Sequence, residues 1–379
     1  MKKIFRNIVI IIIIFSLVFF KLLPFSPIAL YKMLTNEETT EKQFAEDEMT
    51  EETTQFIPMS EDEMKTASTP EQWRKIMDNA VYTLMPEITV DIRGYSENKY
   101  NIASLPYGIA MESKGQSFVG FAESTYKFKY SSDFKLLAAT INPQVMGALN
   151  EEEISTLNTL KDMSEEIKKQ YNYAYARELL IHNYITTSFR YAQNTDGERV
   201  HSVVGLVNDG FAVCQAYADA FRIMCIMCGI PCKIVEGELD GQPHAWNMVK
   251  INGEYYHVDV TSDDPVPDNM FMQHYDYFNV TDEEIQKTHK IVSEGLPECT
   301  STKCNYFVRN GLIVHNQEEL SNLIRLKISD GKSSYTFKTE GYPISGAEQI
   351  SGFYNYTGYT QINVSGKFGK DGAFCVFAA

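Results

Sequence analysis

The sequence predicts an α+β protein, in which helices and antiparallel strands occupy separate stretches of the chain. Residues 151–191 carry apolar residues at helical spacing, among them Leu157 and Leu160. Farther along, Asn252 and Gly253 separate two strand-like runs, and Asn-Gly is a strong signal for a two-residue hairpin. No repeat of fixed period is visible, which favours segregated elements over a solenoid.

The composition indicates a globular protein that carries an acidic tether. Of the 379 residues, 44% are hydrophobic, which supplies one large or two medium domains and excludes a wholly disordered chain. The 34 basic and 50 acidic residues argue against nucleic acid as a partner, because phosphate binding needs Lys and Arg. Eleven acids lie between Glu37 and Glu63, opposed by Lys42 alone. We therefore expect residues 31–69 to form a solvated, disordered tether.

The N-terminal segment predicts export. Lys2, Lys3 and Arg6 precede an apolar run over residues 8–20. The run is short for a membrane span, and no small-residue cleavage site follows it. We expect residues 1–30 to be an uncleaved signal anchor, with a cleaved signal peptide as the alternative. The positive charges place the bulk of the chain outside the cytoplasm, held by a single pass at the cell membrane or secreted.

Three regions are expected after the tether: an N-terminal accessory α+β region (70–150), a core (151–290) and a small C-terminal αβ appendage (291–379). Thr69 and Pro70 predict a helix start, and the helix continues over residues 71–84. The other patterns predict strands at 88–92, 116–121 and 126–130, a helix at 151–191, a strand at 306–314, a helix at 317–328, and strands at 335–339 and 361–364.

The chain has seven cysteines, an odd number that leaves at least one thiol unpaired or intermolecular in an exported protein. Cys225 and Cys228 lie in an apolar helical run, which favours core packing over a metal or redox motif. Two pairs are close enough in sequence to form disulfides: Cys228 with Cys232, and Cys299 with Cys304. A zinc site would need two more ligands at a compatible spacing, so we expect no metal and no cofactor.

One segment of the core places a cysteine at a helix start. GFAVCQAYADAF begins with a glycine turn at Gly210 and becomes helical at Val213 or Cys214. The amide N–H groups and dipole of a helix N-terminus lower a thiol pKa and can receive an oxyanion. Cys214 is therefore a candidate nucleophile.

The next two segments, GQPHAWNMVKI and GEYYHVDVTSDDP, are interpreted as strands at 245–251 and 254–261 that pair around the Asn-Gly turn. Equal offsets from the turn place Ala245 opposite Val260, with His244 and Asp259 on neighbouring rungs. A cysteine, a histidine and a carboxylate in this arrangement are the parts of a nucleophile, base and orienting group.

These residues, in the order Cys–His–Asp, resemble the transglutaminase-like superfamily, and more narrowly its exported bacterial members with a transglutaminase core. The likeness runs from about Tyr171 to Asp282 and includes the upstream segment ARELLIHNYITTSFRY. It implies a transglutaminase/papain-like core, in which the helix that carries the Cys packs on an antiparallel sheet that carries the His and Asp. By matching position it implies Cys214 as nucleophile, His244 as general base and Asp259 as its orienter.

Two positions depart from the family pattern: Ala216 replaces a frequent Gly, and Ser262 stands where a Trp commonly follows the Asp-Val-Thr run. Gln215, Trp246 and His257 are candidates for contact with the substrate or with the catalytic side chains.

Other residues near the motifs are given structural roles. We expect Trp246 to lie on a different strand face from His244, with a core role, and His257 to share a face with Asp259. Asp263 and Asp264 are interpreted as a structural turn. The remaining histidines show no partner spacing and are interpreted as ordinary: His182, His201, His274, His289 and His315.

The resemblance implies acyl transfer through a Cys thioester, on peptide or protein amides near the cell wall. The acceptor stays open between water and an amine. Hydrolysis is favoured, because an amine competes with water only where aromatic side chains exclude water from the thioester. Trp73 and Trp246 are the only tryptophans of the sequence, and Ser262 stands where an aromatic residue would help to exclude water. A catalytically silent peptide-binding or scaffolding module at the cell surface is the alternative, and a structural surface protein that binds a partner through the C-terminal appendage is a third.

Overall fold

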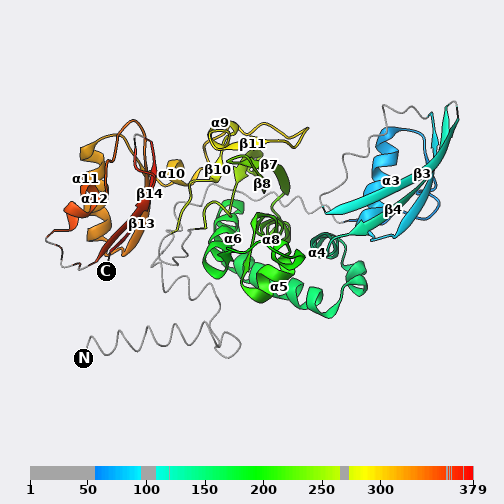
Figure 1. The fold of residues 1–379 in the computed structure, drawn as a ribbon, viewed down its shortest axis with the longest axis horizontal. Coiled ribbons are helices and arrows are strands. Elements are labelled where there is room, and N and C mark those ends of the chain that lie inside the picture. Colours follow the sequence, from blue (N-terminus) through cyan, green and yellow to red (C-terminus); the bar gives the residue numbers. More distant parts are fainter. Residues whose placement is uncertain are drawn as a thin grey trace. The chain divides into compact units, whose positions relative to one another are not determined.

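The computed structural model describes residues 56–94, 108–118, 120–264 and 273–378, except residues 356, 358, 360 and 370. Its helices and antiparallel strands lie in separate stretches, which confirms the predicted α+β class (Figure 1). The predicted signal segment lies outside the described residues. Among the helices that are described, none combines the length and the apolar character of a membrane span.

The first described region packs a helix on a four-stranded sheet. Helix α3 (Pro70–Tyr82) begins as predicted, with the Thr69 side chain accepting a hydrogen bond from Gln72 N. The sheet has the strand order β1-β2-β4-β3. Its strands are β1 (Thr66–Ala67), β2 (Glu87–Arg93), β3 (Ile109–Phe118) and β4 (Phe121–Tyr130). The prediction of one strand over 116–121 is wrong, because this range covers the end of β3 and the start of β4, which pair with each other as a hairpin.

Five α-helices form the helical part of the core: α4 (Ser132–Ile141), α5 (Glu151–Gln170), α6 (Ala174–Ser188), α7 (Val203–Asp209) and α8 (Cys214–Met227). Short 3-10 helices occupy Pro143–Ala148 and Glu198–His201. The prediction of one continuous helix over 151–191 is wrong: the backbone is extended at Tyr171 and at Tyr173, so α5 ends and α6 starts anew.

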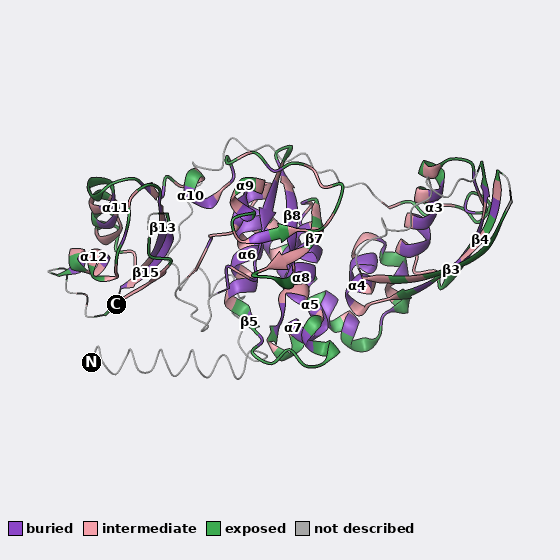
Figure 2. Cartoon of the chain, turned by 45° about the horizontal axis from the view of Figure 1, so that its top comes forward, coloured by how far each residue is buried: buried purple, intermediate pink, exposed green. Residues whose placement is uncertain are grey.

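A five-stranded sheet with the order β10-β9-β8-β7-β11 packs against α8 through β7 and β8. Its strands are β7 (Cys232–Leu239), β8 (Gln242–Ile251), β9 (Glu254–Val258), β10 (Phe278–Val280) and β11 (His289–Ile291). Asn252 and Gly253 both have positive φ, and the pairing of Asn247 with Val258 confirms the predicted hairpin register. Strand β9 ends at Val258 and not at Thr261, because the chain turns after it: Asp263 N donates to the carbonyl of Asp259. Helix α8 is buried along most of its length (Figure 2).

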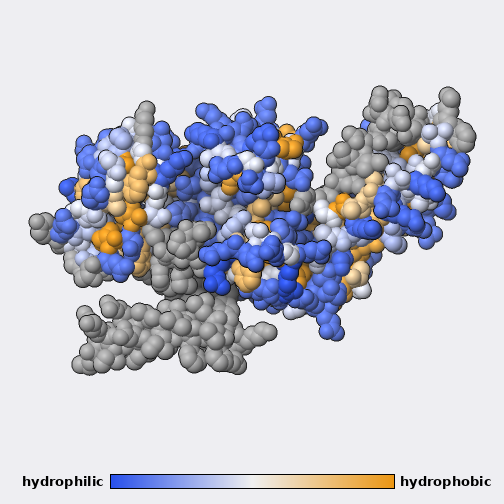
Figure 3. All heavy atoms as spheres, in the orientation of Figure 1, coloured by the Kyte–Doolittle hydropathy of each residue, from blue (hydrophilic) through white to orange (hydrophobic). Residues whose placement is uncertain are grey.

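The C-terminal region contains a second four-stranded sheet, with the order β12-β13-β15-β14. Its strands are β12 (Ile313–Val314), β13 (Ser334–Thr339), β14 (Ile362–Gly366) and β15 (Ala373–Ala378). Helices α11 (Gln317–Ser329) and α12 (Glu348–Ser351) and a 3-10 helix (Gly352–Tyr354) accompany them, and α10 (Tyr306–Arg309) precedes β12. Helix α9 (Asp282–Ile285) instead contacts β9 of the five-stranded sheet, and its Ile285 lies in one buried cluster with Val235 and Trp246. The predicted strand over 306–314 is wrong in its first half, because the Asn305 side chain caps α10. On the face drawn in Figure 3, hydrophobic residues form small groups among hydrophilic ones.

All seven cysteines are free thiols, so neither expected disulfide, Cys228–Cys232 or Cys299–Cys304, is present. Cys225 and Cys228 are fully buried, which confirms their predicted core packing.

Candidate active site

Cys214 is the first residue of α8, as the sequence predicts. Gly210 ends α7 in the left-handed conformation, with φ of 83°, and the chain then forms the short strand β6 (Phe211–Ala212) before the helix begins. Strand β6 pairs in parallel with β5 (Arg190–Tyr191). These two short strands fix the approach of the chain to the helix, and Cys214 is left partly exposed.

His244 on β8 lies between Cys214 and Asp259. Its Nε2 is 2.8 Å from Asp259 Oδ2, and the imidazole is also hydrogen-bonded to the Cys214 thiol. The structure therefore brings the three predicted residues together in the order thiol, imidazole, carboxylate. This is the geometry of a nucleophile, its base and an orienting group. Their catalytic roles remain predictions.

Asp259 is fully buried just beyond the end of β9 and accepts five hydrogen bonds. Thr261 N and Ser262 N donate to Oδ1 at 3.1 and 3.2 Å. Oδ2 receives Ser262 Oγ at 2.5 Å and the Nε2 atoms of His244 and His289 at 2.8 and 3.0 Å. Burial raises the pKa of this carboxyl, but the hydrogen bonds from the two imidazoles and the charge on His244 outweigh burial and hold the pKa well below its usual range.

The charges favour a thiolate beside an imidazolium. Burial opposes protonation of His244, but its hydrogen bonds to Asp259 and Cys214 raise the pKa of His244 to about 10. Burial also disfavours the Cys214 thiolate, but the hydrogen bond and charge of His244, together with a hydrogen bond from the Ala245 backbone, lower the pKa of the thiol. Cys214 and His244 can therefore exist as an ion pair near neutral pH, which is the reactive form of a cysteine nucleophile.

Residues 161–260, which include all three of these side chains, match the family model of the transglutaminase-like superfamily. This part of the chain is a transglutaminase-like domain. The domain confirms the family that the sequence motifs resemble and the expected transglutaminase/papain-like core.

Three solved structures are similar to parts of this chain. A TGase is 16% identical over 47% of this chain and 51% of its own, with a TM-score of 0.27. A candidate cysteine protease from Cytophaga hutchinsonii is 13% identical over 51% and 81%, with a TM-score of 0.26. A candidate protease from Parabacteroides distasonis is 8% identical over 77% and 66%, with a TM-score of 0.23. The chain spans about half the length of the TGase. No curated protein matches the sequence.

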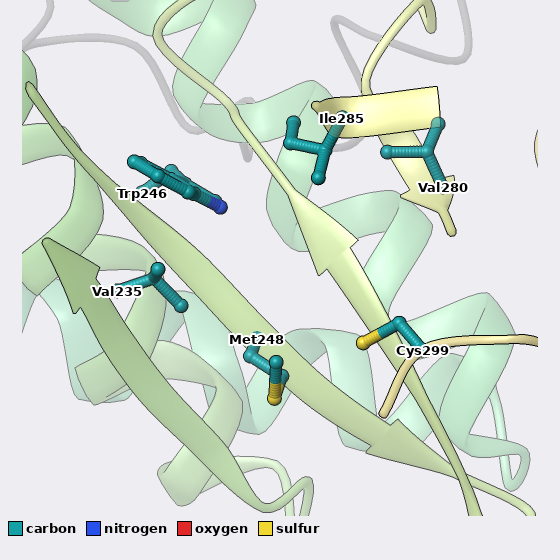
Figure 4. Close-up of a cluster of buried hydrophobic side chains, with 6 residues drawn as sticks. All are labelled: Val235, Trp246, Met248, Val280, Ile285 and Cys299. Atoms are coloured by element: carbon teal, nitrogen blue, oxygen red, sulfur yellow. The ribbon is translucent and has the colours of Figure 1, made fainter. Parts of the chain in front are cut away.

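Trp246 packs against the His244 imidazole. The prediction that it lies on a different strand face from His244 is wrong, because residues two apart on a strand share a face. The Trp246 ring is stacked on the His244 ring, with centroids 6.0 Å apart and an interplanar angle of 22°. Trp246 is fully buried, in a cluster with Val235, Met248 and Cys299 (Figure 4). Its core role is confirmed.

His257 and Gln215 differ in their access to a substrate. His257 is fully buried and accepts a hydrogen bond from the Trp246 indole at 3.0 Å, while its Nε2 lies 2.9 Å from Asp282 Oδ1. Its hydrogen bond to Trp246 links it to His244, on which the indole is stacked, and a role for His257 at the site stays a prediction. Gln215 is the second residue of α8 and is partly exposed beside Cys214, where contact with a substrate stays a prediction.

Three residues that the sequence reasoning did not select lie at this site. His289 and Ser262 donate to Asp259. Tyr191 on β5 has its pKa raised, first by burial and then by the charges of Cys214 and Asp259. Tyr191 is the last residue of the segment ARELLIHNYITTSFRY, and this position was the only sequence signal for it. His289 had no local signal, because its contact depends on the pairing of β11 with β7.

Two neighbouring acids outside this site, Asp263 and Asp264, have buried hydrogen-bond partners. His182 Nε2 lies 3.0 Å from Asp263 Oδ2, and Tyr217 OH donates to Asp264 Oδ2 at 2.5 Å. Asp263 and Asp264 therefore have buried partners that tie the turn to α6 and α8.

Metal-binding residue types gather at two places among the described residues: His244, Asp259 and His289, and His257, Asp282 and Cys299. In the first group, Oδ2 of Asp259 accepts from both imidazoles. In the second, both nitrogens of His257 have hydrogen-bond partners. Hydrogen bonding accounts for both groupings, and we assign neither as a metal site.

Proposed function

We propose that the transglutaminase-like domain is an enzyme of the peptidase- or transglutaminase-like kind, which cleaves peptide or protein amides through a thioester on Cys214. The observation that supports this most directly is the hydrogen-bonded series Cys214–His244–Asp259, with the thiol pKa lowered and the imidazole pKa raised to about 10.

In the first half-reaction, the Cys214 thiolate attacks the amide carbonyl carbon and forms a tetrahedral intermediate. Amides at the start of α8 are available to the oxyanion. The C–N bond then breaks as the His244 imidazolium gives its proton to the leaving amine, which leaves an acyl thioester and a neutral imidazole. Asp259 holds Nε2 of the imidazole so that the other ring nitrogen faces the sulfur.

In the second half-reaction we propose that water is the acceptor. His244 takes a proton from the water as its oxygen attacks the thioester, and the carboxylic acid and the Cys214 thiolate are released. The surroundings of the site support hydrolysis, since an amine competes with water only where water is excluded. Trp246 is buried behind His244, and the Ser262 hydroxyl is bonded to Asp259, so neither covers the thiol as an aromatic lid would.

The place of this chemistry is also a proposal. The apolar run over residues 8–20 and the acidic residues that follow it support a domain tethered outside the cytoplasm, where cell-wall peptides and surface proteins are the accessible amides. Cleavage by surface-added protease in intact cells, mapped by antibodies to each end of the chain, tests this placement.

The reaction is tested by incubating the purified full chain with a mixture of peptides and proteins and recording mass spectra. New termini indicate proteolysis, a gain of about one dalton per Gln indicates deamidation, and loss of ammonia between two chains indicates cross-linking. We expect hydrolytic products that disappear with Cys214→Ala. Isopeptide bonds without hydrolysis would contradict the choice of acceptor, and products that persist with Cys214→Ala would contradict the nucleophile.

The catalytically silent module predicts a different result. It requires that Cys214→Ala fully restores the phenotype of cells that lack the protein. We expect Cys214→Ala to fail in this test although the variant is exported in normal amounts.

A further inference from the structure

A second imidazole, that of His289, is hydrogen-bonded to Asp259, the carboxylate of the Cys214–His244–Asp259 series. His289 begins β11, and its side chain is completely buried. Its Nε2 lies 3.0 Å from Asp259 Oδ2, the oxygen that also contacts His244. The His244 and His289 rings have their centroids 5.4 Å apart. A completely buried histidine has no access to a substrate, and its one hydrogen bond to the Cys214–His244–Asp259 series is the one to Asp259, so we expect its effect on the chemistry to pass through that carboxylate.

The hydrogen bonds determine where the protons lie. The Asp259 carboxylate is an acceptor only, so the Nε2 atoms of both histidines carry protons. The other nitrogen of His289 lies 2.8 Å from Thr288 Oγ1, which is in turn 3.2 Å from the hydroxyl of Tyr277. Thr288 can donate to a neutral His289, and Tyr277 can donate to Thr288. Both nitrogens of the second imidazole therefore have hydrogen-bond partners.

The orientation of Asp259 does not depend on His289. Thr261 N and Ser262 N hold Oδ1, and Ser262 Oγ holds Oδ2. What His289 adds is a donor on the same oxygen that faces His244. Donation to a carboxylate disperses its negative charge, and less of that charge then acts on the neighbouring imidazolium and thiolate.

We propose that His289 is a positioning residue that acts through Asp259, drawing negative charge away from the Cys214–His244 pair. The inference rests on the proposed function of that pair. Loss of the donor is expected to make His244 bind its proton more tightly and to make the Cys214 thiolate harder to form. A more basic His244 gives up its proton less readily to a leaving amine, so turnover falls as well.

Other titratable groups act on the same carboxylate or on Cys214 from neighbouring elements. They are Tyr191 from β5, Cys214 from α8, His244 from β8 and Tyr277 from the segment before β10, and His257 from β9 interacts with His289 itself. None of them is changed in the variants below, so a shift between variants reports the loss of the His289 donor.

The test uses iodoacetamide as the probe on the full chain, with the rate of Cys214 alkylation measured by mass spectrometry from acid to alkaline pH. His289→Gln keeps an amide N–H near the position of Nε2, whereas His289→Asn is one carbon shorter and withdraws it. We expect the pH of half-maximal alkylation to rise by about half a unit in His289→Asn, a threefold change in the proton equilibrium, and to stay near the wild-type value in His289→Gln.

A matched control is available in His182, whose Nε2 makes the same 3.0 Å contact with a buried carboxylate, that of Asp263. His182→Asn loses an equivalent buried hydrogen bond and is expected to leave the alkylation midpoint unchanged. The proposal is overturned if His289→Asn keeps the wild-type midpoint, if His289→Gln shifts as far as His289→Asn, or if His182→Asn shifts equally. If wild-type Cys214 is no more reactive than an ordinary thiol, the proposed function itself fails, and that result is distinct from these three.

Discussion

The indole N–H of Trp246 donates a hydrogen bond to Nδ1 of His257 over 3.0 Å. His257 is held from its other side by Asp282 at 2.9 Å, and Asp282 also accepts from Cys299 N at 2.8 Å. The same indole is stacked on His244, so this buried series of hydrogen bonds holds the ring that packs against the His244 imidazole.

Trp246→Phe keeps an aromatic ring against His244 but removes the donor to His257. We expect the free energy of unfolding to fall by about 1–3 kcal/mol, since a buried acceptor is left unpaired. We also expect alkylation of Cys214 to slow severalfold as His244 gains freedom. Urea denaturation and iodoacetamide labelling measure the two effects.

The second tryptophan provides a control. Trp73 Nε1 makes a comparable buried hydrogen bond, to Tyr126 OH at 3.1 Å, between α3 and β4. Trp73→Phe should also lower stability but leave the alkylation rate of Cys214 within twofold of wild type. Equal slowing in both variants would show that the effect is a general loss of stability.

The thiol pKa values predict selective labelling of Cys214. Burial raises the pKa of Cys228 to about 11. Burial, and to a smaller extent the charge of Asp282, raises the pKa of Cys299 to about 12. The pKa of Cys214, in contrast, is lowered. At pH 7 iodoacetamide should therefore label Cys214 much faster than the other two. Reactivity should fall as pH decreases through the lowered thiol pKa, and the imidazolium should be lost as pH increases through about 10. Equal labelling at pH 7 would contradict the ion pair.

The parts of the site that the sequence predicted are those with local signals. A glycine turn and helical spacing placed Cys214 at the start of α8, and the Asn-Gly turn set the register that brings His244 near Asp259. His289 joins the site through the pairing of β11 with β7, fifty residues apart at His289 and Leu239, and no local pattern reports such a contact.

The fold, like the site, was predicted where the sequence pattern is local and missed where it is not. Apolar spacing predicted α11 nearly to its ends, because its periodicity is local. The strand expected at 306–314 was wrong because one capping side chain, Asn305, starts a helix within an apolar run that also suits a strand. The break between α5 and α6 has no Gly or Pro to mark it; it lies in Tyr171–Tyr173, whose backbone becomes extended.

Glu178 gives a prediction for stability against pH. It is fully buried on α6 and accepts from Asn279 at 2.8 Å, and burial raises its pKa to about 8. The folded state therefore binds a proton that the unfolded state releases between about pH 4.5 and 8, so stability falls as pH rises through this window, by up to about 1.4 kcal/mol per unit. Glu178→Gln mimics the protonated acid and should flatten this dependence in urea midpoints measured at pH 5.5, 7 and 8.5.

A second buried acid should behave in the opposite way. Burial raises the pKa of Glu153, but hydrogen bonds from Lys135, Ser132 and Asn150 outweigh burial and lower it. Its contribution to stability is present above the unfolded pKa and is lost as pH falls. Glu153→Gln should therefore destabilise the chain most at neutral pH, and a loss equal at pH 4 and pH 7 would contradict this assignment.

Tyr191 gives a prediction for the reaction itself. Its side chain is 37% exposed, and the charge of Cys214 contributes to the raised pKa of its phenol. We expect this phenol to donate a hydrogen bond to an acyl group on the sulfur, where charge develops as the amide is attacked. Tyr191→Phe should lower kcat about tenfold with little change in KM or stability, since the ring and its exposure are kept.

Phe211 provides a control. It is similarly exposed, at 42%, but it pairs with Arg190, so its side chain lies on the face of the two-stranded sheet opposite to that of Tyr191. Phe211→Leu should leave kcat within twofold of wild type, and an equal effect of the two substitutions would mean that the Tyr191 hydroxyl has no part in the reaction.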